Sequence, residues 1–302
     1  MKYTLVFVLA LFVIGCSEKV PPQCDYVRGY YPLIYQADYQ FETKNFEEAF
    51  LLYEKAFAHC KPLNTPLYNE ISKFSKASAI LKKDAVTARF LEERIQHGTE
   101  LAALERDTVY AAFFETELGA GIKAKYPELR EAYEASLDLG LRKEIQKMRD
   151  LDQKFRLVPE PDESQIDSID TVNEIRIKEI FETIGYPNDQ VIGGFKVDRI
   201  PTNIDIMLLH TFDSPNREYF LKKVEGFIQN GTCPPMMLGT MIDLYHLKYN
   251  RPQVYGTYTK PNGELSNAID LDSVDKNRLS IGLPTLKQKR QKDSLDAIKY
   301  GY

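Results

Sequence analysis

The apolar side chains between residues 46 and 60 recur at the spacing of an α-helix, and this periodicity constrains the fold more than any other feature. Positions i, i+3, i+4 and i+7 lie on one helical face, so the segment predicts an amphipathic helix. Similar patterns predict helices over 33–41, 68–81 and 84–96, with few strand signals before residue 125. The apolar stripe consists of Phe46, Ala49, Phe50, Tyr53, Ala56 and Phe57.

Ala37, the stretch 45–49 (Asn-Phe-Glu-Glu-Ala) and the stretch 53–56 (Tyr-Glu-Lys-Ala) occupy the first two predicted helices and the turn between them. In this arrangement they resemble a tetratricopeptide unit. The next two predicted helices would form a second unit and residues 101–118 a third layer, because such hairpins bury their faces only by stacking. The resemblance implies a peptide-binding groove. The alternative is a helical spacer that packs against the following domain.

The first sixteen residues have the pattern of a bacterial lipoprotein signal. Lys2 precedes an apolar run over 3–14, and Gly15 places a small side chain before Cys16. The run is shorter than the roughly 20 residues that span a bilayer. We therefore expect Cys16 to carry acyl chains, palmitate among them, that anchor the mature protein to a membrane. The alternative is an ordinary cleaved signal with a chance cysteine.

The expected location is therefore the bacterial cell envelope, with residues 17–24 as a tether between the lipid and the fold. Ser17 differs from the aspartate that is usual for inner-membrane retention, which favours the outer membrane. The chain has 302 residues, enough for two modest domains, which we place at 25–125 and 126–302. Its net charge of −5 argues against nucleic-acid binding, which requires a basic face.

Three further cysteines remain to be assigned. An exported protein meets oxidising conditions, and an antiparallel helical hairpin would bring Cys24 close to Cys60, which favours a disulfide between them. The alternative is two free thiols. Cys233 would stay alone and buried. No CxxC motif or Cys/His cluster indicates zinc, and we expect neither a metal nor a cofactor.

The sequence of the second half predicts an α-rich domain with one β-hairpin. Gly119-Ala120-Gly121 is expected to break the helical run that precedes it. Asn262-Gly263 lies between two β-rich segments and predicts a hairpin within 253–270. The last helix, 284–298, has a basic face that includes Lys292 and is expected to be solvent-exposed rather than a binding patch. The other predicted helices cover 126–139, 141–156, 171–184, 203–212, 217–229 and 234–248.

Several stretches between residues 141 and 284 form an ordered set. They are 148–156 (Met-Arg-Asp-Leu-Asp-Gln-Lys-Phe-Arg), Gly185-Tyr186-Pro187, His210 with Asp213, 251–257 (Arg-Pro-Gln-Val-Tyr-Gly-Thr), and Asp275 with Arg278 and 281–284 (Ile-Gly-Leu-Pro). In this order they resemble a bacterial family known as domain of unknown function 6624. The resemblance implies an architecture, because the family brings no activity. Leu209 and Tyr258 stand where the family tends to have glutamine, which implies an altered site if those glutamines line one.

His210 is the leading candidate for chemistry, because an imidazole titrates near neutral pH and serves as a general base. It follows a strongly apolar helical segment, and Asp213 at i+3 would orient it. The alternative is a buried, hydrogen-bonded histidine that fixes a helix end. Asp243 and His246 repeat this spacing, and two such pairs facing each other would hold a divalent metal. Because this spacing often arises by chance, no metal site is predicted.

Two groups of polar residues are candidate ligand contacts. The first group shares a helical turn, where Gln153 has no packing role and Arg156 would pair with Asp152 at i+4. The second precedes the expected hairpin, and the forked guanidinium of Arg251 suits a carboxylate or phosphate. The alternative is structural in both places. The six residues are Asp152, Gln153, Arg156, Arg251, Gln253 and Tyr255.

Signatures of nucleophilic catalysis and phosphate binding are missing from the sequence. The first functional hypothesis is therefore a binding or scaffolding lipoprotein that holds a peptide or protein partner through its helical repeats. The alternative is a hydrolase-like enzyme in which His210 is the base and Asp213 orients it. Arg251 and Tyr255 would then hold an anionic or polar substrate. A third possibility is that the second half is structural only.

Overall fold

The computed structural model describes residues 24–260, 265–266 and 271–300, and it is almost entirely helical there. The predicted mainly α class is confirmed. Cys16, the signal sequence and residues 17–23 of the predicted tether lie outside the described residues. Among the helices of the described part, none is both long and apolar enough to cross a membrane.

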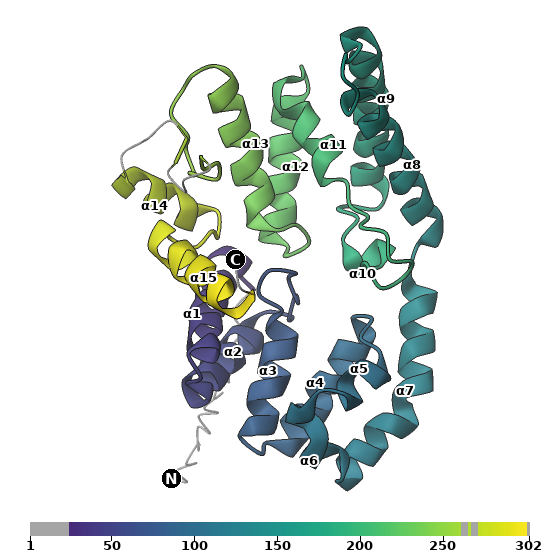
Figure 1. Cartoon of the computed structure of the whole chain (residues 1–302), viewed down its shortest axis with the longest axis vertical. Coiled ribbons are helices and arrows are strands. Elements are labelled where there is room, and N and C mark those ends of the chain that lie inside the picture. The colour runs from purple at the N-terminus through teal and green to yellow at the C-terminus, as the bar shows by residue number, and fades with distance from the viewer. Residues whose placement is uncertain (1–23, 261–264, 267–270, 301–302) are drawn as a thin grey trace, which may run out of the picture.

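Two series of helices follow one another along the chain (Figure 1). The first series is α1 (Tyr31–Glu42), α2 (Phe46–His59), α3 (Glu70–Ile80), α4 (Asp84–Gln96), α5 (Leu101–Glu105), α6 (Ala111–Phe114) and α7 (Glu117–Ser136). The second series is α8 (Leu139–Arg156), α9 (Glu163–Thr183), α10 (Asp189–Ile192), α11 (Asp205–Leu209), α12 (Arg217–Gln229), α13 (Pro235–Lys248), α14 (Leu271–Ser280) and α15 (Leu286–Tyr300). Three short helical turns are η1 (Tyr26–Tyr30), η2 (Thr108–Tyr110) and η3 (His210–Asp213).

Helices α1 to α4 pack consecutively, as the apolar periodicity predicts. The apolar stripe of α2 is buried through Ala49, Phe50, Tyr53 and Ala56. Ala37 of α1 is also fully buried. Because an alanine side chain ends at Cβ, the two helix backbones can lie close together. Beyond this consecutive packing, the tetratricopeptide-like detail is not confirmed.

The predicted layer over 101–118 is not one helix, because the chain breaks there into α5, η2 and α6. Asp107 caps η2 by accepting a backbone N–H at 3.3 Å, and Thr116 caps α7 by accepting the Gly119 N–H at 3.1 Å. The expected break at Gly119 is therefore wrong. A Cβ at this position would lie 2.4 Å from the Phe113 carbonyl oxygen, so glycine allows α6 and α7 to pack closely.

The two series of helices close into a ring in which the last helix returns to the first (Figure 1). Helix α7 runs through the predicted domain boundary between residues 125 and 126, so a continuous helix joins the two halves. On the other side, α15 packs on α1, and both α12 and α14 pack on η1. The two halves therefore meet at both ends and enclose the space between them.

A cluster of buried charges holds α15 against α1. Asp38 of α1 is almost fully buried between Lys73 of α3 and Lys292 of α15, whose Nζ lies 3.4 Å from the Asp38 carboxylate. At the edge of the cluster, Lys299 reaches Glu42 at 3.1 Å. The expected solvent exposure of the basic face of the last helix is therefore wrong for Lys292. The Lys292 ammonium is buried because it compensates the charge of the buried Asp38 carboxylate.

A disulfide joins Cys24, just before η1, to Cys60, at the end of α2. The two cysteines are 36 residues apart, and closing a loop of this length stabilises a fold by about 4 kcal/mol in the chain-entropy model. Cys233 is a free thiol and is buried. The first helical hairpin is therefore closed covalently at its open end.

The predicted hairpin within 253–270 is not confirmed. The described residues of this segment form a single antiparallel bridge, between Thr259 and Leu265, and the predicted turn at Asn262-Gly263 lies outside them. The segment before it instead wraps around the fully buried carboxylate of Asp243 in α13. That carboxylate accepts the backbone N–H groups of three residues, at 2.7 to 2.9 Å. Those N–H groups are the ones that a strand would need for its ladder. The three donors belong to Val254, Tyr255 and Thr257.

Candidate functional site

His210 lies at the start of η3, and its ring faces helix α8. Its Nδ1 is 2.9 Å from Oδ1 of Asp152, a residue 58 positions earlier in the chain. Asp152 is fully buried, whereas the side chain of His210 keeps 20% of its surface exposed. An ionised carboxylate can only accept a hydrogen bond, so Nδ1 donates and the neutral ring keeps its lone pair on Nε2. This is the tautomer that a general base requires.

The other polar residues of the same helical turn complete a charge cluster around Asp152. Gln153 donates its amide N–H to Oδ2 of Asp152 at 2.6 Å. Arg156 contacts Oδ1 of Asp152 at 2.8 Å and both carboxylate oxygens of Asp170 at 2.6 Å. Sequence reasoning missed Asp170, because it lies on the next helix, α9, and has no local motif. The structure thus brings together His210, Asp152, Gln153 and Arg156.

The electrostatics of this cluster keep Asp152 ionised. Burial raises the pKa of its carboxyl, but the hydrogen bonds from His210 and Gln153 and the charge of Arg156 outweigh it and leave the pKa below the ordinary value. Ligand atoms of Asp152, Asp170 and His210 lie within 4.8 Å of one another, a spacing that suits a metal ion. The guanidinium of Arg156 already lies between the two carboxylates, so a divalent cation would have to displace it.

Asp213 does not orient His210, which contradicts the sequence prediction. Its carboxylate accepts the Tyr249 hydroxyl at 2.7 Å and pairs with Lys248 at 2.8 Å. Both partners lie at the C-terminal end of α13, which packs on η3. The short η3 turn therefore directs Asp213 toward α13 and His210 toward α8, and Asp152 takes the orienting position.

The second predicted group, around Arg251, does not join His210. Arg251 is exposed, and its guanidinium lies over the rings of Tyr245 and Tyr249 at about 6 Å. Gln253 is buried and exchanges hydrogen bonds with the backbone of Tyr258, at 2.8 Å in both directions. Tyr255 contributes its backbone to the segment that wraps around the carboxylate on α13. These residues stabilise the loop, which agrees with the alternative of a structural role for this group.

The second Asp/His couple, for which the sequence predicts no metal site, makes other contacts in the structure. Asp243 is saturated by the four hydrogen-bond donors of the wrapped loop, the last being the Thr257 hydroxyl at 2.9 Å. His246 has its Nδ1 2.7 Å from the Pro252 carbonyl oxygen. The carboxylate is therefore committed to the backbone of its own half and has no free ligand atom for a metal.

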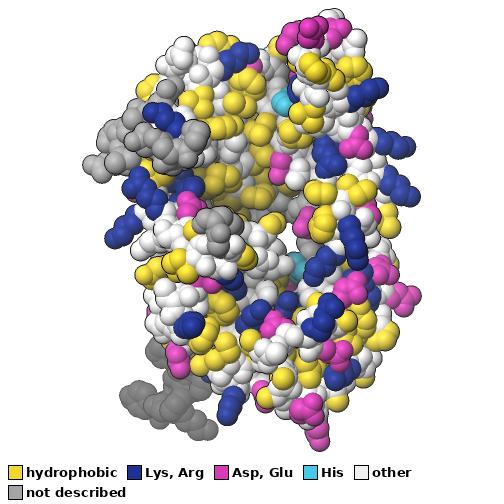
Figure 2. Space-filling view, in the orientation of Figure 1, with side chains coloured by type: hydrophobic (Ala, Val, Ile, Leu, Met, Phe, Trp, Pro, Cys, Tyr) yellow, Lys and Arg dark blue, Asp and Glu magenta, His cyan; other side chains and the backbone are white. Residues whose placement is uncertain are grey.

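A cavity of about 450 Å³ lies between the two halves, at the centre of the ring. Its walls come from η1 and the start of α1, the α2–α3 connection, the end of α4, the residues around α10, the segment 202–205 at the start of α11, and the α12–α13 connection. Figure 2 shows the surface hollowed here, with histidine and acidic side chains at the margin. Sequence reasoning missed this cavity, because its walls are short segments far apart in the chain and no single segment carries a recognisable motif.

One side chain bridges the two halves at the edge of the cavity. Gln190 of the second half lies 2.8 Å from Nδ1 of His97, which ends α4 in the first half. Burial and the nearby charge of Lys61 lower the pKa of His97 to about 4, so the ring is neutral at physiological pH.

The opposite wall carries two carboxylates. Burial raises the pKa of Asp205, against the effect of the Tyr186 hydroxyl that donates to it at 2.6 Å, and the charge of Asp189 raises it further. Burial likewise raises the pKa of Asp189. In the part of the chain that the structure describes, neither carboxylate forms a salt bridge.

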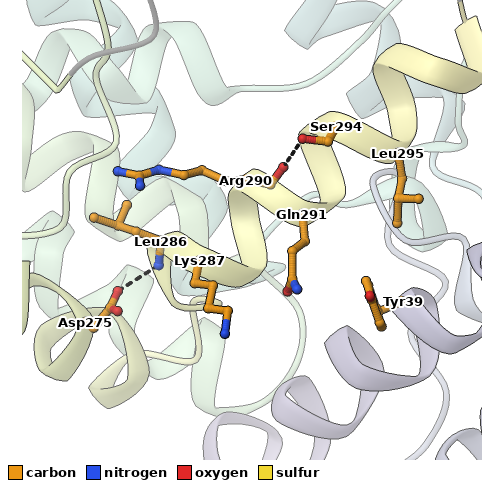
Figure 3. A pocket seen from close by; sticks show the side chains of 8 residues that line it. All are labelled: Tyr39, Asp275, Leu286, Lys287, Arg290, Gln291, Ser294 and Leu295. Atoms are coloured by element: carbon orange, nitrogen blue, oxygen red, sulfur yellow. Dashed lines mark hydrogen bonds between the residues drawn. The ribbon is translucent and has the colours of Figure 1, made fainter.

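A further concave region of about 500 Å³ lies on the outer surface along α15 (Figure 3). Leu286 and Tyr39 make much of its wall apolar. Polar groups here serve the helix itself, since Asp275 accepts the Leu286 N–H at 2.7 Å and Ser294 donates to the Arg290 carbonyl at 2.9 Å. The central cavity, whose two carboxylates form no salt bridge with the described residues, is the stronger candidate for a ligand.

Comparisons of the chain with protein-family models, with curated proteins and with solved structures give no match. The resemblance of the second half to domain of unknown function 6624 and that of the first half to tetratricopeptide units therefore stay predictions.

Glu70, directly behind the cavity wall, generates a prediction on pH. Its buried carboxyl accepts the backbone N–H and hydroxyl of Thr65 at 2.7 and 3.0 Å and the Tyr30 hydroxyl at 3.2 Å. Burial nevertheless raises its pKa from 4.5 to about 7. The folded protein then binds this proton more tightly than the unfolded chain, so the stabilisation is complete below pH 4.5 and is lost as pH rises through 7.

We expect the free energy of unfolding to fall by about 2.5 kcal/mol between pH 5 and pH 8 through this one group. Urea unfolding at four pH values within that window measures the change. Glu70→Gln should flatten the profile, whereas Glu48→Gln, at an exposed position of α2, should leave it unchanged. The assignment is wrong if Glu70→Gln keeps the slope of the natural protein.

Proposed function

We propose that this chain is a lipid-anchored protein of the bacterial envelope that binds a small polar ligand in the central cavity. The observation that carries the proposal is the cavity itself, whose walls come from both halves of the ring. Its volume of about 450 Å³ lies within the range of about 300–1,000 Å³ that is usual for small-molecule sites.

The lining of the cavity supports a polar ligand. Asn64 contributes a side-chain carbonyl oxygen that is shielded from solvent and has no hydrogen-bond partner among the described residues. Asparagine and threonine side chains come from several walls, and Tyr31 and Tyr186 add aromatic surface. Polar groups that converge from separate elements on one space are typical of binding sites.

The ring arrangement of the helices bears on the first functional hypothesis, a protein that holds a peptide or protein partner through its helical repeats. A peptide lying along an open helical groove would need the inner face of the array, but the second half occupies its α1 end through α15. The second half leaves the central cavity unfilled. A compact ligand therefore suits this cavity better than an extended peptide.

A plug in the cavity tests the proposal. Asn230 lies exposed at the cavity wall, and Asn230→Trp should fill the space; Gln229→Trp, one residue earlier and outside the lining, is the matched control. Saturation-transfer NMR with a mixture of hydrophilic fragments should give signals with the natural protein and the control, and lose most of them with Asn230→Trp. Signals of equal strength in all three proteins would count against the cavity.

The envelope location is part of the same proposal. It rests on the N-terminal pattern ending in Cys16, and the disulfide between Cys24 and Cys60 is compatible with an oxidising compartment. Metabolic labelling with radioactive palmitate should label the natural protein and Cys233→Ser but not Cys16→Ser. An unlabelled natural protein would remove the anchor from the proposal.

A second candidate function is general-base hydrolysis at His210, favoured by the 2.9 Å contact with Asp152. In that case His210→Gln and Asp152→Asn should each lower the hydrolysis of model ester substrates at least about 100-fold, since a positioned base contributes typically 10²–10⁴-fold. Asp213→Asn, away from the ring, should leave the rate unchanged. No turnover by the natural protein would exclude this candidate for the esters tested.

A further inference from the structure

We propose that the ligand of the central cavity is a small zwitterion with an ammonium group and a carboxylate, such as an amino acid or a short peptide. Its ammonium would face Asp189 and Asp205, and its carboxylate would face Lys61 and His97. This inference rests on the proposed function, because it concerns the same cavity, and it adds the chemical class of the ligand.

The wall from the second half lacks a positive charge. Asp189 and Asp205 both line the cavity, and each forms no salt bridge with any described residue. The nearest guanidinium, that of Arg142, is committed to Asp198 and to backbone carbonyls, with its N–H groups 2.5–3.2 Å from their acceptors. Two carboxylates that share one space repel each other, and a ligand ammonium would relieve that repulsion.

The Asp205 carboxylate has capacity for such a ligand. The Tyr186 hydroxyl donates to one of its oxygens, at 2.6 Å, and the other accepts no hydrogen bond from the described residues. A carboxylate accepts up to about four hydrogen bonds, so most of this capacity is unused. An ammonium group carries three donors and matches it.

The wall from the first half offers donors instead. The Gln190 side-chain amide donates to Nδ1 of His97 at 2.8 Å, so the neutral ring carries its proton on Nε2 and presents a donor there. Lys61 is exposed at the cavity, and its ammonium forms no salt bridge with any described residue. A neutral donor beside a free cation suits a carboxylate.

The two walls face each other across one cavity, and this polarity separates a zwitterion from other ligands. A simple cation would leave Lys61 uncompensated, and a simple anion would lie against the carboxylates of Asp189 and Asp205. A neutral sugar would leave both walls uncompensated. Only a ligand with both charges pairs with both halves of the ring.

The probes that test this inference are L-alanine, di-L-alanine and tri-L-alanine, together with the N-acetylated and C-amidated forms of each. Isothermal titration at pH 7 and low salt measures their affinities. We expect at least one free form to bind. Blocking either of its ends should weaken binding at least about tenfold, because one wall would lose its partner.

Two variants locate each charge. Asp205→Asn should weaken the free form but leave the N-acetylated form unchanged, since that form has no ammonium to lose. Lys61→Gln should weaken the free form but leave the C-amidated form unchanged. Asp150→Asn and Lys55→Gln, at exposed positions away from the cavity, are the matched controls.

The outcomes separate this inference from the proposed function. If free and blocked forms bind equally, or if none binds, the zwitterion assignment is overturned. The proposed function stands in both cases if the fragment signals still depend on an open cavity in the Asn230→Trp comparison. It falls with the inference only if that dependence is also missing.

Discussion

The buried contact of Asp38 with Lys73 and Lys292 fixes the geometry on which the rest of the structure depends. The three side chains come from α1, α3 and α15, so the two ends of the chain share one charge cluster. Burial raises the pKa of Asp38 although both ammonium groups oppose this, which shows how little solvent reaches the carboxylate. Helix α15 cannot leave α1 without removing one of the two cations that the described residues place on this buried anion.

This closure explains why the central space persists. Helix α7 joins the halves on one side and the charge cluster holds them on the other, so the segments that line the space are held in place from both sides. The hydrogen bond between Gln190 and His97 is a direct side-chain link across that space. A ligand that contacts both halves would strengthen the same closure, since any molecule that binds only the folded state stabilises it.

Local patterns in the sequence predict local structure well. Helices α4 and α12 begin and end at the predicted residues, because apolar periodicity and terminal signals lie within each segment. The orienting partner of His210 was predicted three residues away and lies 58 residues away, at Asp152. The hairpin prediction is not confirmed, and over 254–257 the same limit applies, because Asp243 on another element binds the N–H groups that a strand would use. The cavity escaped prediction because its walls come from several short segments that are far apart in the chain.

The residues of the stretch 251–257 show how a motif can serve the ring rather than a reaction. The buried guanidinium of Arg278 donates to the Tyr255 carbonyl at 2.8 Å and also to the Pro284 carbonyl. In the same turn, the Gly282 carbonyl accepts the Tyr35 hydroxyl of α1. A Cβ on Gly282 would lie 2.8 Å from a ring carbon of Tyr31, and its φ of +86° also favours glycine.

These contacts form a continuous path from Asp243 through Arg278 to α1, and they end beside the charge cluster that Asp38 begins. The two groups of residues that the sequence offers as ligand contacts, around Asp152 and around Arg251, therefore have different roles. One group surrounds His210 within the second half, where its polar atoms stay partly accessible. The other holds the second half onto the first and so maintains the space in which we place the ligand.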